Sequence, residues 1–131
     1  MDIAKDVADF MKKMGYDRPL ADPCCLEDGQ VIMRGGHLLE ETTEWMRAAY
    51  CGDIVGQTDA LIDLIYFAVG TLNMLGMPFD DAWRIVHEAN MRKVPAASNR
   101  DRNDASKPAG WIKPEVALGA LVRSLQERKV T

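Results

Sequence analysis

Two short segments carry acidic side chains at spacings that could hold a metal ion. In the first, residues 38–45, Glu41 and Glu44 are three positions apart and Glu40 lies one turn before Glu44. On a helix this spacing groups the carboxylates on one side, where they repel one another. A divalent cation removes that repulsion, and Mg²⁺ prefers hard oxygen ligands of this kind. The alternative interpretation is a solvated acidic face, which Glu-x-x-Glu commonly forms.

The second segment places two aspartates in the most apolar part of the chain. Asp59 and Asp63 are four residues apart, and Asp63 has large apolar neighbours on both sides. A buried carboxylate requires a cation, a strong hydrogen bond or a proton, and aspartate is a poor helix former. We therefore interpret Asp63 as a metal ligand. The alternative is a structural salt bridge to an arginine such as Arg47 or Arg84.

The elements that must position these acids follow from the spacing of apolar residues. Intervals of three and four predict five helices. Their expected ranges are 3–14, 26–50, 54–75, 78–91 and 114–128. The turn between the second and third helices is short, and Asp53 is a suitable N-cap for the third. Short connections make antiparallel neighbours, so we expect the two sets of acids to face each other at a similar height.

Glycine, proline and polar stretches indicate where these helices bend or end. Gly35 and Gly36 could bend the second helix or mark the true start of its acidic half. Residues 96–110 are polar and predict a long loop, and long loops in compact domains are often functional. We find no internal repeat and no convincing pair of strands. The expected fold is all-α: a four-helix bundle with an extended C-terminal loop and a short final helix, in a single domain over residues 1–131.

Composition and charge exclude several classes of protein. The formal net charge is −4, which argues against binding to duplex nucleic acid. It leaves a nucleotide substrate open, because a bound cation can supply positive charge locally. The third helix is apolar enough to raise the membrane question, but Asp63, Asn73 and Pro78 interrupt it. We therefore expect a buried core helix and no membrane partner.

The cysteines and the N-terminal segment indicate a reducing compartment. The three cysteines, Cys24, Cys25 and Cys51, are an odd number with no Cys-x-x-Cys spacing, so we expect reduced thiols. The first fourteen residues are charged and amphipathic, without the apolar run of a signal peptide. The expected location is cytoplasmic, in a bacterium or a phage-infected host.

Four pieces of the chain, in order, resemble the MazG-type all-α NTP pyrophosphatase superfamily. The likeness is to its small phage and bacterial members, which share a phosphoribosyl-ATP pyrophosphohydrolase-like architecture. The pieces are residues 38–44, 59–66, 86–94 and 107–111. The resemblance implies hydrolysis between the α and β phosphates of a nucleotide, with Mg²⁺ as cofactor and Mn²⁺ as a possible substitute. It also implies a homodimer or a dimer of dimers, with which the apolar third helix agrees.

The resemblance assigns roles to the acids by position. Metal ligands would be Glu41, Glu44, Asp59 and Asp63, and Glu40 would orient or deprotonate the attacking water. The family pattern has a glutamate three residues before Asp63, where this chain has Ala60, and Asp59 is the expected substitute.

The resemblance also assigns contacts to the nucleotide. Asn90 and Lys93, at the end of the fourth helix, would contact it, with Lys93 on phosphate; Lys107 would reach a phosphate and Trp111 would stack on a base. For Lys93 the alternative is a cation that complements the helix dipole, and for Trp111 an anchor for the tail. Arg34 is placed either toward the phosphates or on the surface.

These observations lead to one preferred function and two alternatives. The preferred function is hydrolysis of a nucleoside triphosphate, possibly a purine deoxynucleotide, for nucleotide-pool control or phage nucleotide metabolism. Because Ala60 replaces an expected glutamate, a second function stays possible as an alternative: a catalytically weakened nucleotide-binding or regulatory helical module. A structural helical oligomer would require a protein partner that neutralises Asp63.

Overall fold

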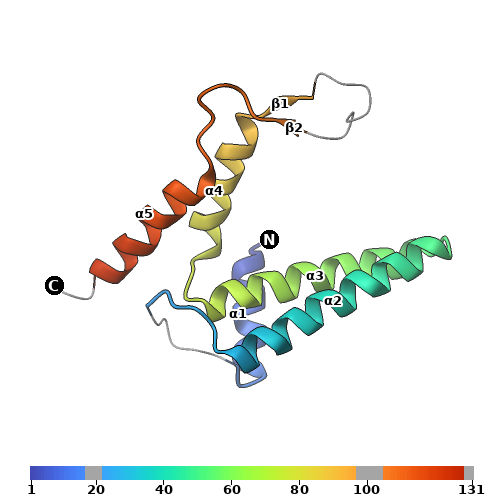
Figure 1. The fold of residues 1–131 in the computed structure, drawn as a ribbon. Coiled ribbons are helices and arrows are strands. Elements are labelled where there is room, and N and C mark those ends of the chain that lie inside the picture. The colour runs from blue at the N-terminus through green and yellow to red at the C-terminus, as the bar shows by residue number, and fades with distance from the viewer. Residues whose placement is uncertain (17–21, 97–104, 129–131) are drawn as a thin grey trace. The chain divides into compact units, whose positions relative to one another are not determined.

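The computed structural model describes residues 1–16, 22–96 and 105–128, and it shows a chain that is mostly helical (Figure 1). The helices are α1 Ile3–Lys13, α2 Asp28–Tyr50, α3 Ile54–Met74, α4 Phe79–Met91 and α5 Pro114–Glu127. The all-α prediction is confirmed. The chain divides into two compact units, Met1–Met77 and Pro78–Thr131. The single domain expected over residues 1–131 stays a prediction.

α1 forms where the apolar stripe predicts it. The side chain of Asp2 caps the helix by accepting a hydrogen bond from the Lys5 backbone N–H at 2.9 Å. Gly15 follows the helix at a φ of +74°, a conformation that glycine adopts without steric cost. Val7 and Met11 are buried and fix the inner face of the helix.

α2 and α3 form a long helical hairpin, drawn in cyan and green in Figure 1. α2 runs without interruption through Gly35 and Gly36, so the glycine pair neither breaks the helix nor begins it. Asp53 accepts hydrogen bonds from the Val55 and Gly56 backbone N–H groups, both at 3.0 Å, which confirms it as the N-cap of α3. The short turn therefore makes antiparallel neighbours, as expected.

Close contacts define the register between the two helices. The contacting pairs are Arg34 with Gly70, His37 with Phe67, and Ala48 with Gly56. From one pair to the next, a step forward along α2 matches a step of the same number of residues back along α3. In this register Glu41 is level with Asp63, and Glu44 is level with Ala60.

α1 crosses α3 and covers one part of the hairpin. The rings of Phe10 and Tyr66 meet edge to face with centroids 5.6 Å apart, and the Asn73 side-chain amide donates to the Met11 sulfur at 3.8 Å. These contacts leave much of the hairpin uncovered. Its exposed large apolar residues include Ile32, Leu39, Met46, Ile54, Val55 and Ile62.

α3 was expected to be a buried core helix, and it is buried only in part. Ala60, Val69 and Gly70 are its buried residues, whereas Leu61 and Ile65 are each 44% exposed. By length and composition α3 could cross a membrane, but a helix at the core of a water-soluble domain passes the same test, so this is weak evidence.

The second unit contains a small sheet that the sequence did not predict. β1 Val94–Pro95 pairs antiparallel with β2 Ala105–Ser106. Two residues per strand are too few to show an alternating pattern, which is why the region was expected to be loop throughout. Residues 97–104 of that expected loop lie outside the described residues. α5 begins with Pro114 in its first turn, as its sequence indicates.

Candidate active site

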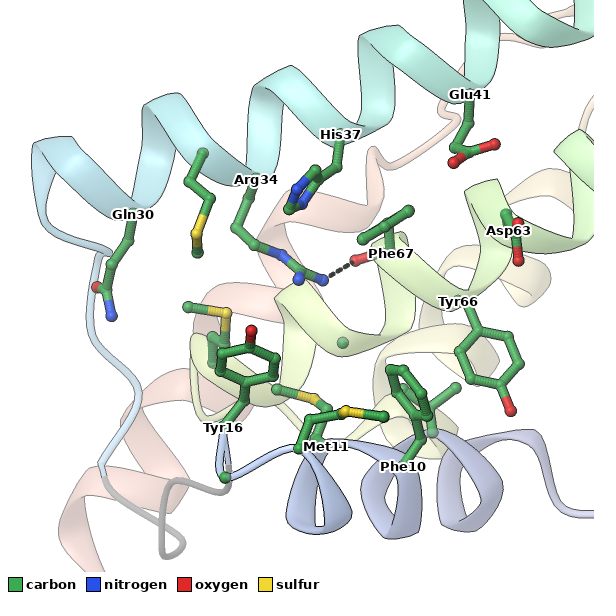
Figure 2. A pocket seen from close by; sticks show the side chains of 16 residues that line it. Phe10, Met11, Tyr16, Gln30, Arg34, His37, Glu41, Asp63, Tyr66 and Phe67 are labelled. Carbon is green, nitrogen blue, oxygen red and sulfur yellow. Dashed lines mark hydrogen bonds between the residues drawn. The ribbon is translucent and has the colours of Figure 1, made fainter.

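A pocket opens between α1, α2 and α3, and two of the predicted metal ligands line it (Figure 2). Its volume is about 630 Å³, within the range of small-molecule sites. Glu41 and Asp63 lie at one end and Gln30 at the other, with Arg34 and His37 between them along α2. Most of the remaining lining is aromatic or thioether: Phe10, Met11, Met14, Tyr16, Met33, Tyr66, Phe67 and Met74.

The pKa of Glu41 shows that the predicted acids form one electrostatic cluster. Burial raises this pKa first, and the charge of Asp63 raises it next. Smaller contributions come from Glu44, Glu40 and Asp59. Since all four carboxylates act on Glu41, the two helices bring the five acids into one region, which we call the acidic cluster.

Within the acidic cluster the side chains divide between two hollows. Glu41 and Asp63 line the main pocket, whereas Glu44 and Asp59 line a smaller hollow of about 320 Å³ nearer the hairpin turn. Glu40 is exposed and lines neither. As the side chains stand, no three Asp, Glu, His or Cys residues in the described ranges are close enough to hold a metal ion.

The acidic cluster nevertheless fits a hard divalent cation in its chemistry. Its donors are carboxylate oxygens, which Mg²⁺ prefers, and their mutual repulsion is what a cation relieves. Glu44 and Asp59 are exposed, and exposed side chains change between staggered rotamers at low cost. Rotation of either one toward Glu41 and Asp63 would supply a third ligand.

Ala60 occupies the position at which the resemblance leads us to expect a glutamate. It is 3% exposed and level with Glu44, so this part of the hairpin interface holds a methyl group rather than a carboxylate. Asp59, the preceding residue, lines the same hollow as Glu44. This position is compatible with Asp59 as the substitute ligand, which stays a prediction.

The alternative of a salt bridge at Asp63 receives no support from the described part of the chain. Lys5 pairs with Asp9 and Arg84 pairs with Asp81, so neither of these ion pairs includes Asp63. Arg47 lines the smaller hollow, not the main pocket. Among the residues the structure describes, no arginine neutralises Asp63.

The sequence left two positions open for Arg34, and the structure shows that it lines the pocket. Its Nε donates to Thr71 Oγ1 at 3.0 Å and its Nη2 to the Phe67 carbonyl oxygen at 2.8 Å. The guanidinium also lies 5.1 Å from the Phe67 ring centroid, and burial lowers the pKa of Arg34. Arg34 is therefore a partly buried cation that lines the pocket and is hydrogen-bonded to α3.

His37 is a site residue that the sequence analysis missed. Its ring stacks on Phe67 with centroids 4.6 Å apart, and its Nδ1 is buried without a hydrogen-bond partner among the described residues. The signal that could have found it is helical spacing, because Arg34, His37 and Glu41 fall on one face of α2.

The second unit brings three of the four predicted substrate contacts together. Trp111 Nε1 donates to the Ala89 carbonyl oxygen at 2.8 Å, so this tryptophan does anchor its loop. Lys93 Nζ and Lys107 Nζ lie 5.6 Å and 5.0 Å from the Trp111 ring. Asn90 is exposed near the end of α4, and its backbone carbonyl oxygen accepts a hydrogen bond from the Lys93 backbone N–H at 3.0 Å. The structure thus groups two lysines and an indole that the resemblance assigned to the nucleotide one by one, and their contact with a nucleotide stays a prediction.

Comparison with protein families is consistent with this arrangement. A model of the family described as phosphoribosyl-ATP pyrophosphohydrolase matches residues 6–90, well over half of the chain. The match includes the whole acidic cluster and Asn90, and it ends before Lys93, Lys107 and Trp111. No significant match is found among curated proteins.

Proposed function

We propose, because the chain belongs to the phosphoribosyl-ATP pyrophosphohydrolase family of MazG-like all-α pyrophosphatases, that it is a Mg²⁺-dependent nucleoside triphosphate pyrophosphohydrolase. Membership implies activity of the nucleotide pyrophosphohydrolase type. The proposed reaction hydrolyses the bond between the α and β phosphates of a nucleotide, such as a purine deoxynucleotide. The products are the monophosphate and pyrophosphate.

The observation that supports this proposal most strongly is the pairing of Glu41 with Asp63. They are level across the hairpin, at the acidic end of a pocket large enough for a nucleotide. The raised pKa of Glu41 records the cost of crowding negative charge there. A divalent cation removes that cost, and a nucleotide brings the phosphate oxygens that complete its coordination.

The roles proposed for the residues are those that the family resemblance implies. Glu41, Glu44, Asp59 and Asp63 would hold the ion. When bound there, Mg²⁺ or Mn²⁺ would supply positive charge to the phosphates and to the pyrophosphate leaving group. Glu40 is exposed one turn before Glu44, and it accepts the proton of the attacking water as the α–β phosphate bond breaks.

The cluster of Lys93, Lys107 and Trp111 is proposed to contact the substrate as well. Both ammonium groups lie near the Trp111 ring, and their positive charge attracts phosphate. The indole is half-buried and anchored to Ala89, so part of the ring is available to stack on a base. Asn90 is proposed as an additional polar contact.

The exposed apolar side chains of the hairpin support self-association. Leu39 is 70% exposed and Ile62 is 50% exposed, and a second copy of the chain would remove such side chains from water. We therefore propose a homodimer or a dimer of dimers, working in the cytoplasm on the nucleotide pool or in phage nucleotide metabolism.

One alternative function has a specific observation in its favour. Ala60 leaves the acidic cluster one carboxylate short of the family pattern, and this would suit a catalytically weakened nucleotide-binding or regulatory module. Such a module binds nucleotide and metal but forms no product.

Product analysis tests the proposal. The full chain is incubated with a panel of ribo- and deoxynucleoside triphosphates, with Mg²⁺ or with EDTA, and the products are separated by anion-exchange chromatography. We expect monophosphate and pyrophosphate with Mg²⁺ only, and at least a roughly 100-fold lower rate in Glu41→Gln. Glu115→Gln, at an exposed site on α5, is the matched control and should keep full activity. The proposal would be refuted if inorganic phosphate were the first product, or if Glu41→Gln kept full activity. Binding of nucleotide and metal without any product would favour the weakened module.

A further inference from the structure

We propose that Arg34 selects the nucleobase by donating hydrogen bonds to a carbonyl oxygen on its edge. The pocket would then accept guanine, hypoxanthine, uracil, thymine or cytosine in preference to adenine. The inference rests on the proposed function, because it concerns the same pocket and assumes that the phosphates lie at its acidic end.

Arg34 is held in place by groups of α3. Two hydrogen bonds, to Thr71 Oγ1 and to the Phe67 carbonyl oxygen, fix the guanidinium on one side. Gly70 makes room for it, since a Cβ at that position would lie 2.8 Å from Arg34 Nη2. A guanidinium has five N–H donors, so the two bonds to α3 leave three that can meet a ligand.

The charge of Arg34 is not matched by a carboxylate among the described residues. Neither of their ion pairs includes it. Burial lowers the pKa of this group, which means that its positive charge is poorly solvated in the pocket. Unused donors on a desolvated cation gain more from a ligand oxygen than neutral donors do.

The position of Arg34 favours the base over a phosphate as its partner. It precedes Glu41 by seven residues on the same helix, which is about 10 Å along the axis. Neighbouring phosphates in a nucleotide lie closer together than this distance. The stretch between the two residues is lined by His37 on Phe67 and by Phe10 and Met11, which suit a flat ring rather than a charged chain.

The chemistry of a guanidinium favours bases with a carbonyl group. It donates and cannot accept, so it suits an oxygen acceptor on the base edge. Adenine has an exocyclic amine where hypoxanthine has its carbonyl, and the other common bases each carry at least one carbonyl oxygen. His37, whose Nδ1 is buried without a partner among the described residues, is a second polar side chain that lines the same pocket. Its tautomer decides whether it donates or accepts.

The comparison of dITP with dATP tests the inference most sharply, because the two bases are nearly identical in shape. We expect wild-type kcat/KM for dITP to exceed that for dATP by at least about tenfold. In Arg34→Met the ratio should approach one, through a higher KM for dITP. Arg34→Lys keeps the charge but loses the fork of donors, so it should retain only part of the preference. Arg84→Met, an exposed arginine of the second unit, is the control and should keep the wild-type ratio.

Binding measurements separate this inference from the proposed function. Calorimetry with non-hydrolysable α,β-methylene analogues of dITP and dATP, in Mg²⁺, needs no turnover. A preference for the dITP analogue that depends on Arg34 would support the inference even if no nucleotide were cleaved.

Two results would overturn it. One is equal or tighter binding of the dATP analogue by the wild type. The other is an unchanged ratio of the two affinities in Arg34→Met whose circular dichroism shows a native fold. If both affinities fall equally in that variant, Arg34 contacts a phosphate and not the base. If Arg34→Met does not fold, the ratio of dITP to dATP affinity in the wild type and in Arg34→Lys still tests the inference.

Discussion

Glu41 on α2 and Asp63 on α3 stand level with each other across an antiparallel hairpin, and they share the acidic end of one pocket. Burial raises the pKa of Glu41, and the negative charge of Asp63 raises it further. The fold therefore accepts a local electrostatic cost, which a bound cation would remove.

This cost predicts a dependence of stability on pH. Because the folded state raises the pKa of Glu41 above its ordinary value of 4.5, the folded chain binds this proton more tightly than the unfolded chain. The stabilising contribution is present in full below pH 4.5 and is lost as the pH rises through the raised pKa. We expect the melting temperature of the metal-free protein to fall more steeply over this window in the wild type than in Glu41→Gln, as followed by circular dichroism. Added Mg²⁺ should restore stability at neutral pH, and parallel curves for the two proteins would contradict the assignment.

The tryptophan of the second unit should have separable structural and binding roles. Trp111→Phe removes the hydrogen bond to Ala89 but keeps an aromatic ring near the two lysines, so the free energy of unfolding should fall by about 1 kcal/mol with little change in KM. Trp111→Ala should raise KM as well. Urea denaturation and steady-state kinetics measure the two effects. Trp83→Phe, at a position 62% exposed, is the matched control, and equal losses of stability in both phenylalanine variants would argue against the anchor.

Gly70 should matter for selectivity more than for stability. In Gly70→Ala the new Cβ would lie 2.8 Å from Arg34 Nη2 and would displace the guanidinium from its hydrogen bonds to Thr71 and Phe67. The higher helix propensity of alanine offsets part of the stability lost with these bonds. We expect a small fall in the melting temperature and a lower preference for dITP over dATP. Gly36→Ala, where no atom lies within 4 Å, should add about 0.5–1 kcal/mol of stability and leave the preference intact. An unaltered preference in Gly70→Ala would show that Arg34 does not need its present position.

Self-association should depend on the exposed apolar residues of the hairpin. Multi-angle light scattering should give a mass well above the 14.6 kDa of one chain. Leu39→Lys or Ile62→Lys should lower that mass without loss of helical content, because both side chains are largely exposed in the single chain. Ile112→Lys, on an exposed position of the second unit, serves as the control. A wild-type mass equal to one chain would refute the proposed oligomer.

The helices and their ends could be predicted from local signals. Asp53 as an N-cap and Gly15 as a stop act through their own backbone neighbours, so their roles can be read from a short stretch of sequence. The β1–β2 pair was missed because two-residue strands have no periodicity to detect.

The site was predictable where it depends on one helix and less so where it depends on two. The spacing of Glu41 and Glu44 is visible in the sequence, as is that of Asp59 and Asp63. The role of Arg34 depends on Gly70, which is distant in sequence and reaches it only through the register of the hairpin. Such a register arises from side-chain packing between helices, which single-helix periodicity does not describe.

The most direct test of the acidic cluster is calorimetric titration of the full chain with Mn²⁺ and with Mg²⁺, alone and with a non-hydrolysable nucleotide. The account predicts saturable binding by the wild type, at least about tenfold weaker binding by Asp63→Asn, and unchanged binding by Asp80→Asn at an exposed position in the first turn of α4. Equal affinities for the wild type and Asp63→Asn, or no metal binding by the wild type even with nucleotide, would contradict it.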